Sequence, residues 1–370
     1  MNGKPWKVLL VGVALVFCRG TSLLGAQAHQ SAAPPVLSEA TREKVLRFVR
    51  ERFGVPNTVH LSLGGLRSSF ASGFYEASLT VDEGKNKHDQ AVWISKDSRY
   101  LILGGLVDLD QTSNPEIIRH IRAAFKVPDK VGLSLGTFHR SASADFQEGT
   151  LIVEEGKVKQ ERPLLLSRDG KHLILGEIYT LGVDLRQQAL RAISLHNAPS
   201  QGPASAPVTI VEYADLECPS CAAVHEFFET QLLPRYGNKV RVVFKEFPLT
   251  GIHEWSLTGA IACQCAYEIN PSAYVPLRTA LFRAQQLINA ATLRDLLLTY
   301  GEQAGVDRVK LAACIDAKAS LPRVEADLAE GKRVNVDRTP IAFVNGKMII
   351  GLPSPETYYQ AVDEALRGAK

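Results

Sequence analysis

The chain repeats itself over a shift of 72 residues, and this feature constrains its fold more than any other. Four blocks match their partners without a gap. They are residues 53–56 with 125–128, 61–64 with 133–136, 81–85 with 153–157, and 101–104 with 173–176. A period of this length is too long for a solenoid unit. We therefore expect two small domains, or two halves of one, over residues 38–110 and 111–184.

Each copy begins with the pattern of an amphipathic helix. The apolar positions recur at helical spacing on one face, and they are Val45, Leu46, Val49 and Phe53 in the first copy and Ile117, Ile118, Ile121 and Phe125 in the second. Thr41 and either Ser113 or Asn114 are the expected N-caps. Strands are expected at about 59–63, 74–81, 91–95 and 100–103, with equivalents 72 residues later. Each copy is thus predicted to be a small α+β unit, a helix on an antiparallel sheet.

The first 28 residues have the pattern of a secretory signal peptide. Lys4 and Lys7 form a basic start, residues 8–17 are apolar, and residues 26–28 (Ala-Gln-Ala) form a small-residue cleavage site. The apolar run is too short to span a bilayer, and no other stretch is long enough. We expect cleavage near Ala28, a periplasmic or secreted bacterial protein, and no membrane span after removal of the signal. Such a compartment preserves disulfides.

The charge balance argues against nucleic acid as a partner. The chain has 42 basic and 39 acidic residues, and the excess lies in the signal segment at Lys4, Lys7 and Arg19. Proteins that bind nucleic acid use an excess of positive charge against the phosphates. No such excess remains after residue 28, so no nucleic-acid partner is expected.

Residues 208–368 are expected to alternate between strands and helices in one domain. Strands are predicted at 208–214 and 239–247, helices over 255–335, and a hairpin over 340–350 on an Asn-Gly turn. A last helix starts near residue 354. The preceding segment, 185–207, is predicted to be a helix followed by a Pro/Ser/Ala-rich linker.

Two cysteines occupy the junction between the first of these strands and its helix. Residues 218–221 read Cys-Pro-Ser-Cys, and the helix follows at once. Free N–H groups and a partial positive charge at a helix N-terminus stabilise a thiolate, the reactive form of cysteine. A permanent disulfide and a zinc site are the alternatives. Zinc needs four ligands, and Cys263 and Cys265 would point apart on a helix, so we expect neither metal nor cofactor.

Residues 204–368 resemble the DsbA-like branch of the thiol-disulfide oxidoreductases. The resemblance rests on Glu212, the Cys-Pro-Ser-Cys motif, Phe247-Pro248, His253 and residues 338–346. It implies a thioredoxin fold with a helical insertion, in a multidomain α+β and α/β chain.

The same resemblance assigns roles to individual residues. Cys218 is the expected nucleophile and Cys221 the resolving thiol, and disulfides pass through a mixed disulfide with the substrate. Glu212 matches the acid that this family places near the resolving cysteine, where it can mediate proton transfer, with Lys245 a candidate partner across the sheet. Thr339 and Pro340 match the family's cis-proline loop, where an extended substrate pairs with the backbone.

A structural disulfide is also implied by the resemblance. Relatives carry cysteines in the helices of the insertion, where Cys265 and Cys314 lie. We predict that these two pair and that Cys263 is buried and free. Pairing of Cys263 with Cys314 is the alternative.

The repeats carry a second resemblance. Residues 164–179 (Leu-Leu-Leu-Ser-Arg-Asp-Gly-Lys-His-Leu-Ile-Leu-Gly-Glu-Ile-Tyr) and, less closely, residues 91–109 resemble the N-terminal dimerisation domain of disulfide isomerases of the DsbC/DsbG kind. Those proteins carry one copy and pair two chains. Two copies in tandem imply a monomer with intramolecular pairing of the repeats, although a homodimer stays open.

The sequence therefore predicts an exported enzyme that exchanges disulfides with protein substrates, as an oxidase or an isomerase. A second protein would recycle its cysteine pair. The alternative is a non-catalytic periplasmic chaperone or a thiol-based metal-binding protein. Cu(I) favours thiolate and thioether ligands, and the chain has only two methionines, which argues against a copper carrier.

Overall fold

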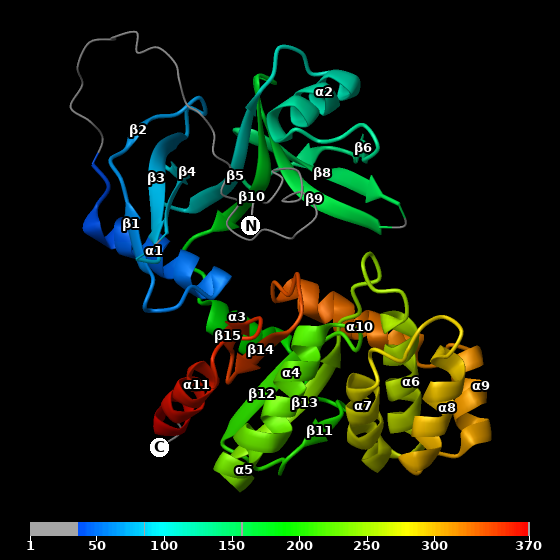
Figure 1. Ribbon diagram of the computed structural model, residues 1–370. Coiled ribbons are helices and arrows are strands. Elements are labelled where there is room, and N and C mark those ends of the chain that lie inside the picture. Colours follow the sequence, from blue (N-terminus) through cyan, green and yellow to red (C-terminus); the bar gives the residue numbers. More distant parts are fainter. Residues whose placement is uncertain (1–35, 85, 157, 369–370) are drawn as a thin grey trace, which may run out of the picture. The chain divides into compact units, whose positions relative to one another are not determined.

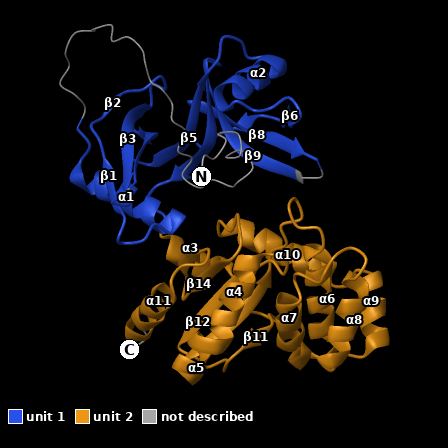
Figure 2. Ribbon diagram, viewed as in Figure 1, with its two compact units in different colours: residues 1–183 blue, residues 184–370 orange. Residues whose placement is uncertain are grey.

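The computed structural model describes residues 36–84, 86–156 and 158–368. The predicted signal peptide lies outside these residues. The chain (Figure 1) divides into two compact units, residues 1–183 and 184–370 (Figure 2). The first is built on a large antiparallel sheet and the second on a smaller mixed sheet with helices. The predicted α+β and α/β multidomain class is confirmed.

Each copy of the repeat forms one helix and the same series of strands. The first copy has α1 (Glu39–Phe53), β1 (His60–Leu63), β2 (Arg67–Ser68), β3 (Phe74–Asp82), β4 (Lys87–Ser95) and β5 (Tyr100–Asp108). The second has α2 (Asn114–Phe125), β6 (Gly132–Leu135), β7 (His139–Arg140), β8 (Phe146–Glu155), β9 (Val158–Ser167) and β10 (His172–Thr180). The last two strands of each copy are longer than expected.

The cap of the first helix differs from the prediction. Ser38, not Thr41, is the N-cap of α1, and its side chain accepts a hydrogen bond from the backbone N–H of Thr41. The expectation for Thr41 was wrong because the helix begins at Glu39, well before Val45, the first apolar residue of its pattern. Ser113 is the N-cap of α2, with Pro115 in the first turn.

The two copies are joined by the antiparallel pairing of β5 with β10. The register places Gly104 opposite Gly176, which is its own equivalent in the second copy. A repeat that pairs with itself at equivalent residues has the symmetry of an isologous two-fold contact. One continuous sheet results, in the order β1-β3-β4-β5-β10-β9-β8-β6.

Each helix completes its core with a strand of the other copy. Phe48 and Phe53 of α1 pack against Tyr179 of β10 in tilted and edge-to-face arrangements, with ring centroids 5.4 and 5.9 Å from that of Tyr179. Phe125 of α2 shares an apolar cluster with Val107 of β5. Because neither copy buries its helix alone, the repeats are two halves of one unit.

The second unit has a five-stranded sheet in the order β11-β13-β12-β14-β15. Its strands are β11 (Ser200–Gln201), β12 (Val208–Ala214), β13 (Val240–Glu246), β14 (Ile341–Val344) and β15 (Lys347–Ile350). β12 is parallel to β13 and antiparallel to β14. Asn345 and Gly346 both have positive φ in the β14–β15 turn, as a two-residue hairpin of this kind requires.

Helices cover both faces of this sheet. The cluster on one face includes α4 (Pro219–Phe227), α6 (Ser256–Ile269), α7 (Tyr274–Arg283), α8 (Leu293–Gln303), α9 (Arg308–Asp316) and α11 (Pro355–Gly368). α4 continues through Phe228–Leu232 into α5 (Leu233–Tyr236). On the other face α10 (Leu321–Arg333) packs against β13, and α3 (Leu185–Ala192) packs against β15.

The segment 185–207, expected to be a helix and a linker, belongs to the second unit and packs against its sheet. Ala189 and Ala198 belong to the same apolar cluster as Tyr213 and Phe343 in the sheet. The division into units falls between residues 183 and 184.

The close approach of β5 and β10 gives a test of the joined sheet. A Cβ added to Gly176 would lie 2.0 Å from the carbonyl oxygen of Leu103, whereas one added to Gly65 would have no heavy atom within 4 Å. Gly176→Ala should therefore lower the free energy of unfolding of the first unit by about 2 kcal/mol or more. Gly65→Ala, the control, should change it by less than about 0.5 kcal/mol. Hydrogen exchange of peptides from β5 and β10 measures both, and equal protection in the two variants would contradict this register.

Candidate active site

The paired cysteines lie at the junction between β12, which ends at Ala214, and α4, which begins at Pro219. Cys218 is the N-cap of α4, with Pro219 at the first helical position. The backbone N–H of Cys218 donates to the carbonyl oxygen of Asp215 at 3.1 Å, and that of Cys221 donates to the carbonyl oxygen of Cys218 at 3.1 Å. Both thiols are free. Cys218 is 8% exposed and Cys221 is fully buried, so Cys218 is the thiol nearer the surface.

The pairing of β12 with β14 brings Thr339 and Pro340 to Cys218. The register sets Glu212 opposite Ala342 and continues toward the start of β14. The peptide bond between Thr339 and Pro340 is cis. The thiol of Cys218 donates to the carbonyl oxygen of Thr339 at 3.7 Å. The predicted catalytic and substrate-binding residues therefore meet at one place.

The two thiols differ sharply in acidity. The pKa of Cys218 falls to about 6, chiefly because the Cys221 thiol hydrogen-bonds to it; the N–H groups of Cys221 and Ser220 at the start of α4 act in the same direction, and burial opposes them. Burial raises the pKa of Cys221 well above its usual value, and its bond to Cys218 adds to this. Cys218 is thus the more acidic of the two thiols, and Cys221 keeps its proton at neutral pH.

Asp215 fixes the loop that precedes Cys218. Its carboxylate accepts hydrogen bonds from the backbone N–H of Leu249 at 2.6 Å and from Nδ1 of His253 at 2.8 Å. Its own N–H donates to Sγ of Cys221 at 3.5 Å. Burial opposes the charged form of His253, but the bond to Asp215 raises its pKa on balance. The 248–253 loop is thereby tied to the cysteine pair.

Glu212 is fully buried on the same face of the sheet as Cys221. Its neighbours Val211 and Tyr213 belong to the cluster on the opposite face, whereas Ile210, Ala214 and Cys221 share the other cluster. The cation that meets Glu212 is Arg278 of α7, whose Nη2 donates to Oε2 of Glu212 at 3.0 Å. Burial raises the pKa of Glu212, and Arg278 opposes this.

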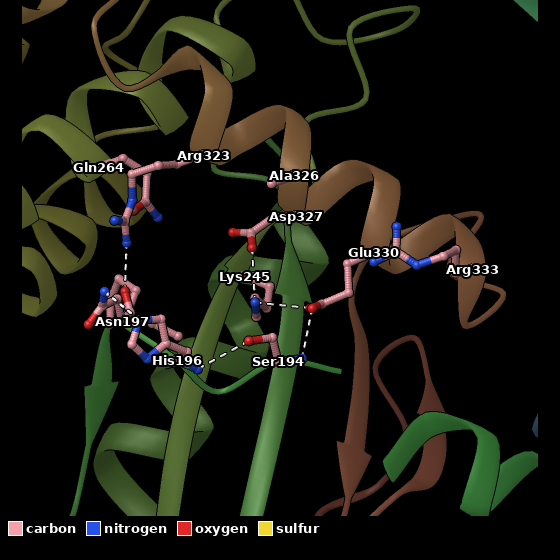
Figure 3. A pocket seen from close by; sticks show the side chains of 12 residues that line it. Ser194, His196, Asn197, Lys245, Gln264, Arg323, Ala326, Asp327, Glu330 and Arg333 are labelled. Atoms are coloured by element: carbon pink, nitrogen blue, oxygen red, sulfur yellow. Dashed lines mark hydrogen bonds and ion pairs between the residues drawn. The ribbon is translucent and has the colours of Figure 1, made fainter. Parts of the chain in front are cut away.

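Lys245, the partner expected for Glu212, lies on the other face of the sheet. Its Nζ is 3.0 Å from Asp327 and 2.9 Å from Glu330. Figure 3 shows these two ion pairs at the wall of a pocket between α10, β13 and the 194–199 segment. The expectation was wrong because side chains alternate along a strand, and Lys245 follows Phe244, which belongs to the Cys221 cluster.

The cysteines of the helical insertion lie outside this constellation. Cys265 of α6 and Cys314 of α9 form a disulfide, with Cα atoms 5.9 Å apart. Cys263 is free and fully buried. The hydroxyl of Ser320 donates to Sγ of Cys265 at 3.4 Å and to Glu268 at 2.7 Å. The structural role of this disulfide stays a prediction.

Among the described residues, one group of side chains is close enough to hold a metal ion, namely Asp110, Glu116 and His120 in the first unit. Arg119 already pairs with Glu116 at 2.7 Å and with Asp110 at 3.2 Å. Because the Arg119 guanidinium already balances the charge of both carboxylates, we do not propose a metal site here.

Arg278 is the residue that the sequence analysis missed. It lies on the apolar face of α7, in series with Tyr274, Leu277, Leu281 and Phe282, all of which are buried. An arginine at an apolar position of a helix signals a buried partner, because an unpaired buried charge is costly. That signal was present in the sequence.

Residues 195–364 match the protein family described as Thioredoxin. Disulfide bond formation protein D of Bacillus subtilis is 23% identical over 47% of this chain and 80% of its own length. Na(+)/H(+) antiporter NhaA 3 of Salinispora tropica is 31% identical over 46% of this chain. The chain spans only 25% of that antiporter's length. No helix among the described residues is long and apolar enough to cross a membrane.

Solved structures align with about half of the chain. BdbD from Bacillus subtilis in its oxidised form matches with a TM-score of 0.42 and 22% identity, over 47% of this chain and 95% of its own. α-DsbA1 from Wolbachia pipientis matches with a TM-score of 0.43 and 21% identity, over 49% of this chain and 97% of its own.

The family match and the strand order define the C-terminal unit as a thioredoxin-like domain. The relatives that this unit resembles include disulfide bond formation proteins of Bacillus subtilis and Bacillus cereus. The predicted resemblance of this half is confirmed. Residues 38–184 lie outside the family match, and their resemblance to the isomerase dimerisation domain stays a prediction.

The lowered pKa of Cys218 gives a direct test of the site. Because only the thiolate reacts, the rate of alkylation by iodoacetamide should rise with pH and level off above an inflection near pH 6. Cys221→Ala removes the largest cause of the shift, the side chain that hydrogen-bonds to Cys218, and should move the inflection to higher pH. Cys218→Ser should abolish the fast reaction. An inflection near 9 in the unaltered protein would refute this account of the site.

Proposed function

We propose that the protein is an exported thiol-disulfide oxidoreductase that donates its Cys218–Cys221 disulfide to protein thiols. The observation that carries the proposal is the asymmetry of the pair. Cys218 at the start of α4 has a pKa of about 6, while Cys221 behind it is buried and keeps its proton. A stabilised thiolate favours the reduced form, which makes the corresponding disulfide an oxidant.

The proposed reaction proceeds in two exchanges. A substrate thiolate attacks Sγ of Cys218 in the disulfide form, the Cys218–Cys221 bond breaks, and Cys221 leaves and takes up a proton. A second substrate thiolate then attacks the substrate sulfur of the mixed disulfide. This releases Cys218 as a thiolate and leaves the substrate with a new disulfide. The substrate dithiol is oxidised and the cysteine pair is reduced, so a second protein must reoxidise the pair.

Exposed apolar side chains on three loops support protein substrates. Leu287, 62% exposed, follows Gln285, whose Nε2 donates to the carbonyl oxygen of Cys218 at 3.1 Å. Ile252, 51% exposed, precedes His253, which is bonded to Asp215. Leu352, 53% exposed, follows Gly351, whose N–H donates to the carbonyl oxygen of Pro340 at 2.8 Å.

These three loops converge on Cys218 through their contacts, and apolar side chains beside a reactive thiol suit an unfolded chain that exposes its own core residues. The backbone around Thr339 and Pro340 is the proposed pairing site for that chain.

Refolding of a reduced disulfide protein distinguishes the directions of exchange. The oxidised protein should convert reduced, unfolded ribonuclease A to disulfide-bonded forms stoichiometrically, whereas Cys218→Ser should not. Cys221→Ser should trap a mixed disulfide through Cys218 that is visible without reductant. Activity on scrambled ribonuclease but not on the reduced form would replace the oxidase with an isomerase. Binding of unfolded protein that survives in Cys218→Ser, with no exchange at all, would leave the chaperone alternative.

We further propose that the mature protein is periplasmic and monomeric. The signal pattern of residues 1–28 supports export, and pairing of β5 with β10 occupies within one chain the strands that would otherwise join two. Native mass spectrometry of protein from the periplasm of a bacterial host should give one chain that begins near residue 29. A full-length chain would contradict cleavage, and a dimer would contradict the closed pairing.

A further inference from the structure

A buried cluster of charges lies beneath the cysteine pair. Arg278 is fully buried, and its guanidinium lies 4.9 Å from the ring centroids of both Phe244 and Phe282. It donates to Oε2 of Glu212 at 3.0 Å, and its Nη1 lies 3.8 Å from Oε2 of Glu246. One cation therefore serves two buried carboxylates.

Glu246 has its own hydrogen bonds, whereas Glu212 depends on Arg278. The hydroxyl of Tyr274 donates to Oε1 of Glu246 at 2.6 Å, and Gln264 donates to the same oxygen at 3.4 Å. Oε1 of Glu212 has no hydrogen-bond partner within the described part of the chain. A buried carboxylate with a single donor is held in its charged form mainly by the cation that supplies the donor.

Several other ionisable groups interact with the cluster or lie next to groups that do. They are Cys218 and Cys221 of the active site, His225 of α4, Cys263 of α6, Tyr274 of α7, Asp327 of α10 and Tyr358 of α11, with His253 beyond Asp215. Burial keeps His225 neutral by lowering its pKa to about 3. Among these groups, Arg278 is therefore the cation paired with Glu212.

We propose that Arg278 is a positioning residue that holds Glu212 charged beneath Cys221, so that Glu212 takes the thiol proton when Cys221 attacks a mixed disulfide at Cys218. This assignment rests on the proposed function of the cysteine pair. Glu246 competes for the same guanidinium and so weakens its hold on Glu212.

The step balances without another reactant. The proton of the Cys221 thiol passes to the carboxylate of Glu212, directly or through a water molecule. The thiolate of Cys221 attacks Sγ of Cys218, the Cys218–substrate bond breaks, and the substrate sulfur leaves as a thiolate. The two protein cysteines are oxidised to a disulfide and the substrate sulfur is reduced.

The roles of the two glutamates predict opposite pH shifts. The charged form of Glu212 is the base, so the rate of this step should fall about tenfold per pH unit below the pKa of Glu212. Arg278→Met removes the cation, raises that pKa and moves the fall to higher pH. Glu246→Gln removes the carboxylate that competes for Arg278, so that Arg278 pairs with Glu212 alone. This lowers the pKa of Glu212 and moves the fall in rate to lower pH.

The experiment follows the reaction of reduced protein with 5,5′-dithiobis(2-nitrobenzoate) by stopped flow, in a Cys18→Ser background. The first thionitrobenzoate released reports attack by Cys218, and the second reports attack by Cys221 on the mixed disulfide. Cys218 does not titrate during the second step, because its sulfur is in the disulfide. Thionitrobenzoate is a good leaving group throughout the range studied.

We expect the pH midpoint of the second phase to rise by at least one unit in Arg278→Met and to fall in Glu246→Gln. Glu212→Gln should slow the second phase at least tenfold and remove the midpoint. The first phase should be normal in Glu246→Gln. Arg278→Lys, which keeps the charge, should restore part of the shift.

Unchanged midpoints in Arg278→Met and Glu246→Gln would overturn the assignment, as would shifts in the same direction. A midpoint that survives in Glu212→Gln and disappears in His253→Gln would give the proton transfer to His253 instead. Should Arg278→Met fail to fold, Glu246→Gln and the neutral pair Glu212→Gln/Arg278→Met carry the test, and the neutral pair should behave as Glu212→Gln. A missing first phase in the unaltered protein would contradict the proposed function instead.

Discussion

The pairing of β12 with β14 is the constraint on which the site depends. β12 ends at the loop that carries Cys218, and β14 starts directly after Thr339 and Pro340. Since the two strands are antiparallel neighbours, the end of one lies beside the start of the other. The register therefore sets the thiol of Cys218 against the carbonyl oxygen of Thr339, 121 residues away in the sequence. The sheet is a scaffold that brings two loops together at one point.

A second pairing plays the same part in the first unit. Gly104 and Gly176 face each other across β5 and β10, and each helix rests on the strand of the other copy. The tandem repeat thus encodes both halves of a two-fold contact within one chain. Equal numbers of helices and strands in the halves follow from the duplication, whereas the described residues contain one thioredoxin-like unit. The chain therefore has one Cys218–Cys221 pair for two repeats. An assembly of two chains with one repeat each would have one cysteine pair for every repeat.

The sequence predicted correctly those features that depend on the residues of a single helix, strand or turn. The strand before Cys218, the helix after it and the Asn-Gly turn each depend on neighbouring residues, and they lie where their patterns placed them. The repeat register followed from four matching blocks. The partner of Glu212 did not follow, because it requires knowing which helix of the insertion covers which face of the sheet. Alternation along β13 should have turned Lys245 away from Glu212, since Phe244 is the residue that faces the cysteines.

On each face of the sheet, one buried cation lies close to two carboxylates. On the α10 face, Lys245 meets Asp327 and Glu330, and Tyr213 donates to Glu330 at 2.7 Å. Lys245 and Glu330 are buried, each 5% exposed, where they line the pocket of Figure 3. On the α4 face, Arg278 is fully buried beside the rings of Phe244 and Phe282. Its electrostatic interactions with Glu212 and Glu246 are therefore weakly screened. Under the proposed mechanism, the Cys221 thiol keeps its proton in one step and releases it in the next, so a group that can accept the proton has to lie close to it. The pair of Glu212 and Arg278 lies on the face of the sheet that carries Cys221, where the proposed proton transfer would take place.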